Sequence, residues 1–157
     1  MKLQTVLALT TATLSVSAGK FLDPTFYARE VAPRESSRIE DYRAAHVGNL
    51  TPEQTIVLDD IQAAIPSPAD ADLPGLENAC FKAFEAAECK FLLTGKTAAS
   101  KMKRDNNLIR RAMCDCSDES DWCDDGFRCS YHQDSCGVYS GCGTLNAYPC
   151  DGLCIVQ

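Results

Sequence analysis

Apolar residues recur at the spacing of an α-helix in three stretches in the middle of the chain,. The first stretch begins with helix signals: Thr51 is a good N-cap, Pro52 suits the first helical position and Gln54 completes a capping box,. Its apolar face consists of Val57, Leu58, Ile61 and Ile65. The pattern therefore predicts a helix over residues 51–65, which ends before the next proline.

The second and third patterns cover residues 76–94 and 97–113. The apolar stripe of the second consists of Leu76, Cys80, Phe84, Ala87 and Phe91, and that of the third of Met102, Leu108, Ile109 and Met113. On one uninterrupted helix, Cys80 and Cys89 would point to opposite faces at positions ~13 Å apart along the axis. A disulfide requires Cα atoms within ~7 Å. The pattern therefore predicts that these two cysteines pair with cysteines farther along the chain.

The other segments show no sustained helical period. Residues 1–18 begin with Met1 and the charged Lys2, continue as an apolar run and end in small residues, which is typical of a secretory signal peptide cleaved after Ala18,. Residues 19–49 are rich in charges, and we expect a flexible polar leader there,. Asn49 opens a glycosylation sequon,. Residues 114–157 combine cysteines with glycines, which predicts a loop-rich module.

Cysteine usage changes the picture most. The ten cysteines are Cys80, Cys89, Cys114, Cys116, Cys123, Cys129, Cys136, Cys142, Cys150 and Cys154. In an exported chain an even number of clustered cysteines predicts a disulfide framework, here of five bridges,. Cys114 and Cys116 flank a single residue and should have different partners. We therefore expect a small disulfide-rich α or α+β domain over residues 50–157. In it, two or three helices are stapled by disulfides to the module of residues 114–157.

Charge also sets the module apart. Residues 112–157 carry eight acidic side chains and one basic side chain, a net charge of −7, which equals the net charge of the whole chain. Nucleic-acid binding requires clustered Lys and Arg, so this balance argues against a nucleic-acid partner. After the signal peptide no apolar run approaches the ~20 residues that cross a bilayer, so we expect no membrane span and an extracellular location.

The acidic run at the start of the module is a candidate calcium site. Asp115, Asp118, Ser120 and Asp121 fit the spacing of the calcium loop of LDL-receptor class A modules, and this short segment resembles that loop. The resemblance implies that the three aspartates would bind calcium, a hard cation that prefers oxygen ligands. The alternative is an acidic loop that only keeps the module soluble. We expect no other metal and no cofactor.

Two dibasic pairs, which end at Arg104 and Arg111, are of the sort that kexin-like or furin-like proteases cleave. A cut after Arg111 would free residues 112–157 as a cysteine-rich peptide, in the order of segments found in toxin or antimicrobial precursors. If Cys80 and Cys89 bond to the module, however, a cut chain would stay covalently connected. The intact form is therefore the expected one.

A signal peptide, small size, ten cysteines and dibasic pairs together resemble the small secreted cysteine-rich effector and toxin proteins of fungi and oomycetes. That resemblance implies a virulence-type binding protein, a monomer that contacts a protein or cell-surface target. The expected contact surface consists of Trp122, Phe127, Tyr131, Tyr139 and Tyr148, because aromatic residues on rigid loops anchor interfaces,. Neither His46 nor His132 lies in a pattern typical of a catalytic triad, so we predict no enzyme activity and no catalytic residues,.

Overall fold

The computed structural model of the protein describes residues 21–97, 112–131 and 136–157. Four features predicted above lie outside these ranges: the signal peptide with Ala18, the two dibasic pairs with Arg104 and Arg111, most of the third helix, and His132. Within the described ranges, no helix combines the length and the apolar character needed to span a bilayer.

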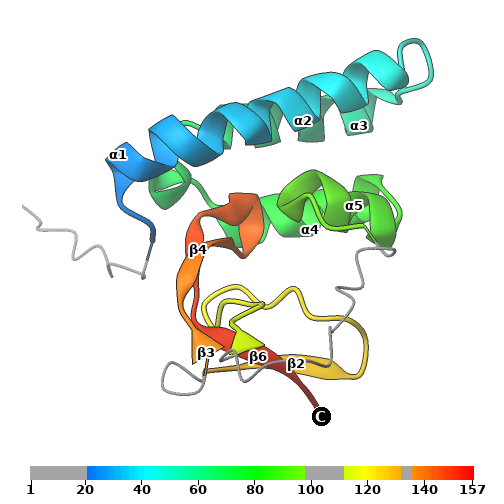
Figure 1. Ribbon diagram of the computed structural model, residues 1–157. Coiled ribbons are helices and arrows are strands. Elements are labelled where there is room, and N and C mark those ends of the chain that lie inside the picture. The colour runs from blue at the N-terminus through cyan, green and yellow to red at the C-terminus, as the bar shows by residue number, and fades with distance from the viewer. Residues whose placement is uncertain (1–20, 98–111, 132–135) are drawn as a thin grey trace, which may run out of the picture.

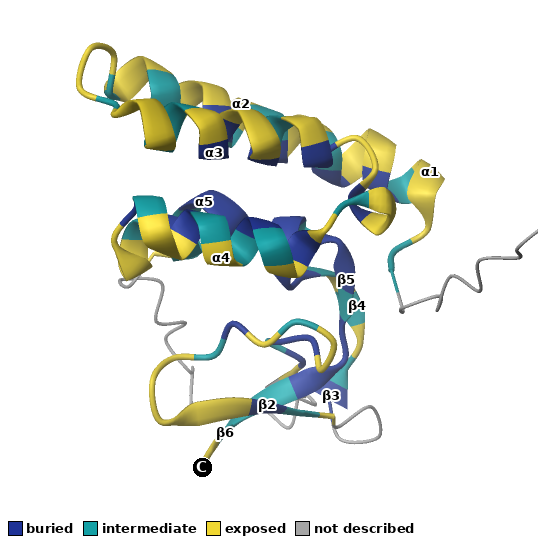
Figure 2. Cartoon of the chain, turned by 180° about the vertical axis from the view of Figure 1, so that it is seen from behind, coloured by how far each residue is buried: buried dark blue, intermediate teal, exposed yellow. Residues whose placement is uncertain are grey.

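The elements form three layers (Figure 1). The first layer consists of α2 (Ala32–Ala45) and α3 (Pro52–Ala64), and the second of α4 (Leu73–Ala83) and α5 (Ala86–Thr94), with the short helix η2 (Pro68–Asp70) between α3 and α4. The short strands of the C-terminal module lie beyond the second layer. Buried residues gather on the facing sides of the two helical layers (Figure 2). The helices therefore bury one shared apolar core.

Helix α3 confirms the first predicted helix. Thr51 accepts a hydrogen bond from the backbone of Gln54, and the side chain of Gln54 bonds back to the backbone of Thr51. Its apolar face is buried, with Leu58 and Ile61 fully covered. Local capping signals and a regular stripe were sufficient here because they agree with the tertiary packing.

The prediction of a flexible leader over residues 19–49 is wrong for its described part, residues 21–49. Here α1 (Pro24–Phe26), the π-helical turn η1 (Tyr27–Val31) and α2 follow one another without a break. The buried positions of this segment include Val31, Glu35, Ile39 and Tyr42, which form one stripe at helical spacing,. The stripe is hard to recognise in the sequence because one of its members is charged.

The prediction of one helix over residues 76–94 is also wrong. Phe84 ends α4 in extended backbone, and Glu85 precedes α5 in extended backbone as well. Phe84 is buried and its ring meets Tyr42 edge-on at 5.9 Å. The resulting turn brings the Cα atoms of Cys80 and Cys89 to 5.6 Å, and these two cysteines form a disulfide with each other. The predicted bridges from these cysteines to the module therefore do not exist.

The described residues of the C-terminal part, 112–131 and 136–157, form three two-stranded pairings, and this whole part is called the module from here on. They join β1 (Ala112–Met113) to β3 (Cys136–Gly137) in parallel, β2 (Phe127–Tyr131) to β6 (Gly152–Val156) antiparallel, and β4 (Tyr139–Cys142) to β5 (Tyr148–Cys150) antiparallel. Between β4 and β5 lies the short helix η3 (Thr144–Asn146). Residues 112 and 113, where the third helix was predicted to end, thus belong to a strand.

All four disulfides of the module close within it: Cys114–Cys136, Cys116–Cys129, Cys123–Cys154 and Cys142–Cys150. With Cys80–Cys89 they make the five predicted bridges, and no cysteine is free. The small cysteine-rich α+β architecture is confirmed, as are the different partners of Cys114 and Cys116. The prediction that disulfides staple the helices to the module is wrong, because no disulfide joins the two parts. They share an apolar core instead.

Candidate functional site

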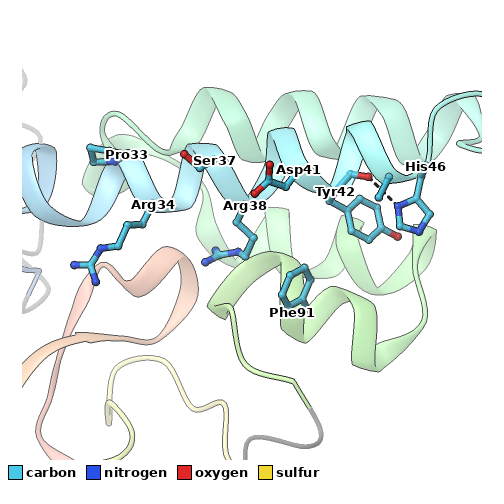
Figure 3. A pocket seen from close by; sticks show the side chains of 9 residues that line it. Pro33, Arg34, Ser37, Arg38, Asp41, Tyr42, His46 and Phe91 are labelled. Atoms are coloured by element: carbon cyan, nitrogen blue, oxygen red, sulfur yellow. Dashed lines mark hydrogen bonds between the residues drawn. The ribbon is translucent and has the colours of Figure 1, made fainter.

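A groove of about 720 Å³ runs along α2 where this helix faces α5 (Figure 3). It is lined by Pro33, Arg34, Ser37, Arg38, Asp41, Tyr42, Ala45, His46 and Phe91. All but Phe91 belong to α2 or to its C-cap, so one helix face forms most of the lining, and Phe91 comes from α5. The volume lies in the range of ligand-binding clefts, ~300–1,000 Å³.

One end of the groove is aromatic. Tyr42 stacks on His46 with ring centroids 4.1 Å apart. The hydroxyl of Tyr42 lies 3.2 Å from Glu88 Oε1 as a hydrogen-bond donor, and His46 Nδ1 lies 2.8 Å from the carbonyl oxygen of Tyr42. Burial, reinforced by the charge of Glu88, raises the pKa of Tyr42 to about 12. The stacking and these two hydrogen bonds hold both rings in place.

The other end of the groove is basic. Arg38 forms an ion pair with the buried Glu35 and donates to the carbonyl oxygen of Leu92 at 3.0 Å. Arg34 is exposed, and of its three nitrogens only Nε has a hydrogen-bond partner within the described residues, the carbonyl oxygen of Glu30 at 2.7 Å. Arg38 therefore maintains the structure, whereas the Nη atoms of Arg34 can bind a carboxylate.

Two residues of the predicted aromatic surface lie in the core instead. Trp122 is 8% exposed, stacks on Phe81 at 5.7 Å and donates from Nε1 to Thr144 Oγ1 at 2.9 Å. Tyr148 is 9% exposed and stacks on Phe21 at 4.7 Å. Both rings cover the helical part of the protein, because the module has little apolar core of its own. Neither is available as a free contact residue.

The other three predicted aromatic residues remain wholly or partly at the surface. Phe127 and Tyr131 are 41% and 43% exposed on β2, and Val156 lies opposite Phe127 in the β2–β6 ladder. Tyr139 is half-buried, and burial, followed by the nearby charge of Asp115, raises its pKa. The well-exposed part of the predicted surface is thus reduced to Phe127 and Tyr131, the first and last residues of β2.

The candidate calcium ligands are not brought together. Asp115 Oδ1 accepts a hydrogen bond from the backbone of Cys154, and the carboxylate of Asp121 accepts from the backbones of Cys123 and Cys129, all at 2.9 Å. Within the described ranges, no three carboxylates gather closely enough to bind one ion, and the groups that do gather contain disulfide-bonded cysteines. Asp115 and Asp121 therefore fix the backbone of the disulfide loops.

Asn49, the predicted glycosylation site, is exposed in the turn after α2. The groove itself was missed by sequence reasoning. A usable signal exists: Tyr42 and His46 lie four residues apart, so they share a helix face once the helix is recognised,. Comparison of the chain with protein-family models, with curated proteins and with solved structures found no match.

Proposed function

We propose that this chain is a secreted, disulfide-stabilised protein that binds a protein target outside the producing cell or on a host, without catalysing a reaction. The groove of α2 and α5 is the contact site. The observation that carries this proposal is the combination of an apolar, aromatic lining with the hydrogen-bonded side chains of Arg38 and Tyr42 and with the exposed guanidinium of Arg34. The hydrogen-bonded side chains of Arg38 and Tyr42 fix the shape of the groove and are not free to transfer protons. Five disulfides suit an oxidising, extracellular environment,.

The occupant of the groove is an apolar segment of the target that carries a carboxylate. Phe91 and His46, which are half-buried, offer ring surface to an apolar side chain,. The exposed guanidinium of Arg34 offers a charged donor at one end of the same groove,. Together these features select an acidic residue beside an apolar one.

Anilinonaphthalene sulfonate, an apolar anion, is a suitable probe of this site. Its fluorescence should rise on the folded protein and fall strongly in Ser37→Trp, which fills the middle of the groove. Arg34→Gln should weaken binding about tenfold, as expected for one lost charged hydrogen bond. Ile56→Trp is the matched control, because Ile56 is 60% exposed on α3 outside the groove. Equal fluorescence of the Ser37→Trp and Ile56→Trp variants would contradict the proposal.

A second function is favoured by the disulfide pairing. Every cysteine of residues 112–157 pairs within that range. A cut after Arg111 would therefore free a peptide with four internal disulfides, as in a toxin or antimicrobial precursor. The pairing of Cys80 with Cys89 removes the reason to expect a covalently connected product.

Mass spectrometry of the secreted protein under denaturing, non-reducing conditions distinguishes the two functions. The binding protein gives one chain, whose mass rises by ten hydrogens on reduction of its five disulfides. The precursor gives a separate chain that begins at Ala112, or at Asp105 after a cut at the first pair. The absence of any such chain from the mature secreted protein would refute the precursor.

A further inference from the structure

The β4–β5 hairpin enters the helical part of the protein. Its hairpin tip, residues 143–147, lies beside α4 and α5 and below α2 (Figure 1). Thr144 and Leu145 are completely buried, and Leu145 belongs to the same apolar core as the helices. The Cys142–Cys150 disulfide closes the hairpin just behind the tip. The tip is therefore the main anchor of the module.

Hydrogen bonds surround the tip from several helices. The Tyr27 hydroxyl donates to the carbonyl oxygen of Leu145 at 3.0 Å. The Asn146 side-chain amide donates to Glu35 Oε1 at 3.0 Å and to the carbonyl oxygen of Thr94 at 3.2 Å. The Thr144 hydroxyl donates to a carboxylate on α4, that of Glu77. The module thus presents an apolar side chain with donors on either side, and the helices present a pocket bordered by carboxylates.

The backbone of the tip is strained. Leu145 and Asn146 have φ angles of 55° and 51°, in the left-handed region that non-glycine residues seldom adopt,. Such a conformation costs about 1–2 kcal/mol for a residue like leucine and persists only where the surroundings hold it. The contacts with the helices therefore hold the tip in a conformation that the hairpin alone would not favour.

Two features of the module favour a fold that persists without the helices. Its second core cluster consists of Cys114, Cys136, Cys142 and Cys150, with Tyr139 and Leu153 packed against it. Four internal disulfides, each typically worth about 2–4 kcal/mol, stabilise this small unit. On separation from the helices it would expose Trp122, Leu145 and Tyr148, which the helices now cover.

We propose that the helical part, residues 21–97, masks a second interaction surface of the module, formed by Trp122, Leu145, Asn146 and Tyr148. A cut in the chain between residues 97 and 112 makes this surface available. The partner it fits is a protein with an apolar pocket bordered by carboxylates, because the helices now supply that chemistry through Glu35 and Glu77. This inference rests on the precursor function, and it assigns the helical part the role of a reversible cover.

The test uses the full chain with a cleavage site for a sequence-specific protease inserted after residue 104, so that it does not depend on natural processing. After cleavage the two parts should stay together when concentrated and separate on dilution. Trp122 emission should shift to longer wavelength on separation, because the indole becomes exposed. The separated module should keep the dispersed amide proton spectrum of a folded unit.

Two matched variants test the carboxylate contact. Asn146→Asp places a carboxylate against Glu35, and the cut chain should separate at a concentration at least about tenfold higher than the unmodified cut chain. Asn78→Asp adds the same charge at an exposed position of α4 and should have no such effect. Three results would overturn the proposal: no separation of the cut chain at any dilution, equal behaviour of the two variants, or unfolding of the separated module. A missing natural cut would refute only the precursor function.

Discussion

Glu35 is the residue that organises the centre of the molecule. It is 2% exposed, in the middle of α2, and its carboxylate meets Arg38 on the same helix and Asn146 of the hairpin tip. A buried carboxylate is costly unless its charge and lone pairs are matched. Glu35 therefore stabilises the fold only as one member of a group contributed by both halves of the protein.

Glu35→Gln should destabilise the protein by about 3 kcal/mol, because it keeps the side-chain shape but leaves the Arg38 charge without a counter-charge. Urea unfolding measures the loss. Glu30→Gln removes the carboxylate of the exposed Arg29–Glu30 pair and should cost no more than about 1 kcal/mol,. Equal losses for the two variants would show that burial of the Glu35–Arg38 pair does not matter.

The raised pKa of Tyr42 predicts how the stability of the protein responds to alkaline pH. Its pKa is about 12 in the folded protein, compared with 10.0 for a free tyrosine. Below pH 10 the folded and the unfolded states both keep the phenol proton, so the contribution of Tyr42 to the stability of the fold is fully present. Between pH 10 and 12 only the unfolded state releases this proton, so stability falls. Burial also raises the pKa of Tyr27, in the same direction.

Urea midpoints measured across this window, with phenolate absorbance followed in parallel, test the prediction. Tyr42→Phe should make the decline between pH 10 and 12 shallower, because one raised phenol is removed. A decline as steep as that of the unmodified protein would exclude Tyr42 as a contributor.

At the scale of elements, the corner between α4 and α5 positions the floor of the groove. The break at Phe84 and Glu85 lets α5 fold back along α4, which places Phe91 beneath α2. Burial of Phe84 and the Cys80–Cys89 disulfide both hold this corner. A continuous helix would carry Phe91 away from the groove.

Replacing Cys80 and Cys89 together by alanine should lower the free energy of unfolding by about 2–3 kcal/mol, as expected for a short closed loop. The corresponding pair Cys142 and Cys150 closes a loop of similar length, with sequence separation 8 compared with 9. Its removal should cost more, because the disulfide also restrains the strained hairpin tip. Urea unfolding of the two double variants compares them, and a larger loss for the Cys80–Cys89 pair would contradict this view of the tip.

At the scale of the whole molecule, two differently stabilised halves meet at a common core. The helical half is held by apolar packing, and the module by four disulfides. Polar contacts also cross the boundary: Lys90 pairs with Asp124 at 2.7 Å, and Lys96 Nζ donates to the carbonyl oxygen of Asp115 at 3.0 Å. Burial lowers the pKa of Lys96 despite this acidic environment. Lysines of the helical part thus meet the acidic module directly.

Reduction of all five disulfides should unfold the module and leave the helical half folded. The module should unfold, because a cluster made mainly of cysteines cannot hold it, whereas most of the helical signal at far-ultraviolet wavelengths should remain. Trp122 emission should shift to longer wavelength as the indole leaves Phe81. Circular dichroism and fluorescence recorded on the same reduced sample test this, and simultaneous loss of both signals would show a single cooperative unit.

The sequence by itself determined the features that depend on near neighbours. The capping box of Thr51 and Gln54 predicted where α3 begins, and cysteine content predicted five disulfides. The different partners of Cys114 and Cys116 also followed from their spacing. The residues of the capping box and the pair Cys114 and Cys116 lie a few positions apart, so chain geometry alone constrains these two outcomes, whereas the number of disulfides follows from the even number of cysteines.

Only the tertiary structure decided the rest. Helix α2 could not be recognised because Glu35 interrupts its stripe, and its burial depends on Asn146, 111 residues away. The break before α5 depends on the packing of Phe84 against Tyr42. That break in turn decided the pairing of Cys80 and Cys89, and with it the covalent independence of the module. Contacts between distant residues set these outcomes, because burial can outweigh a local pattern that favours a continuous helix.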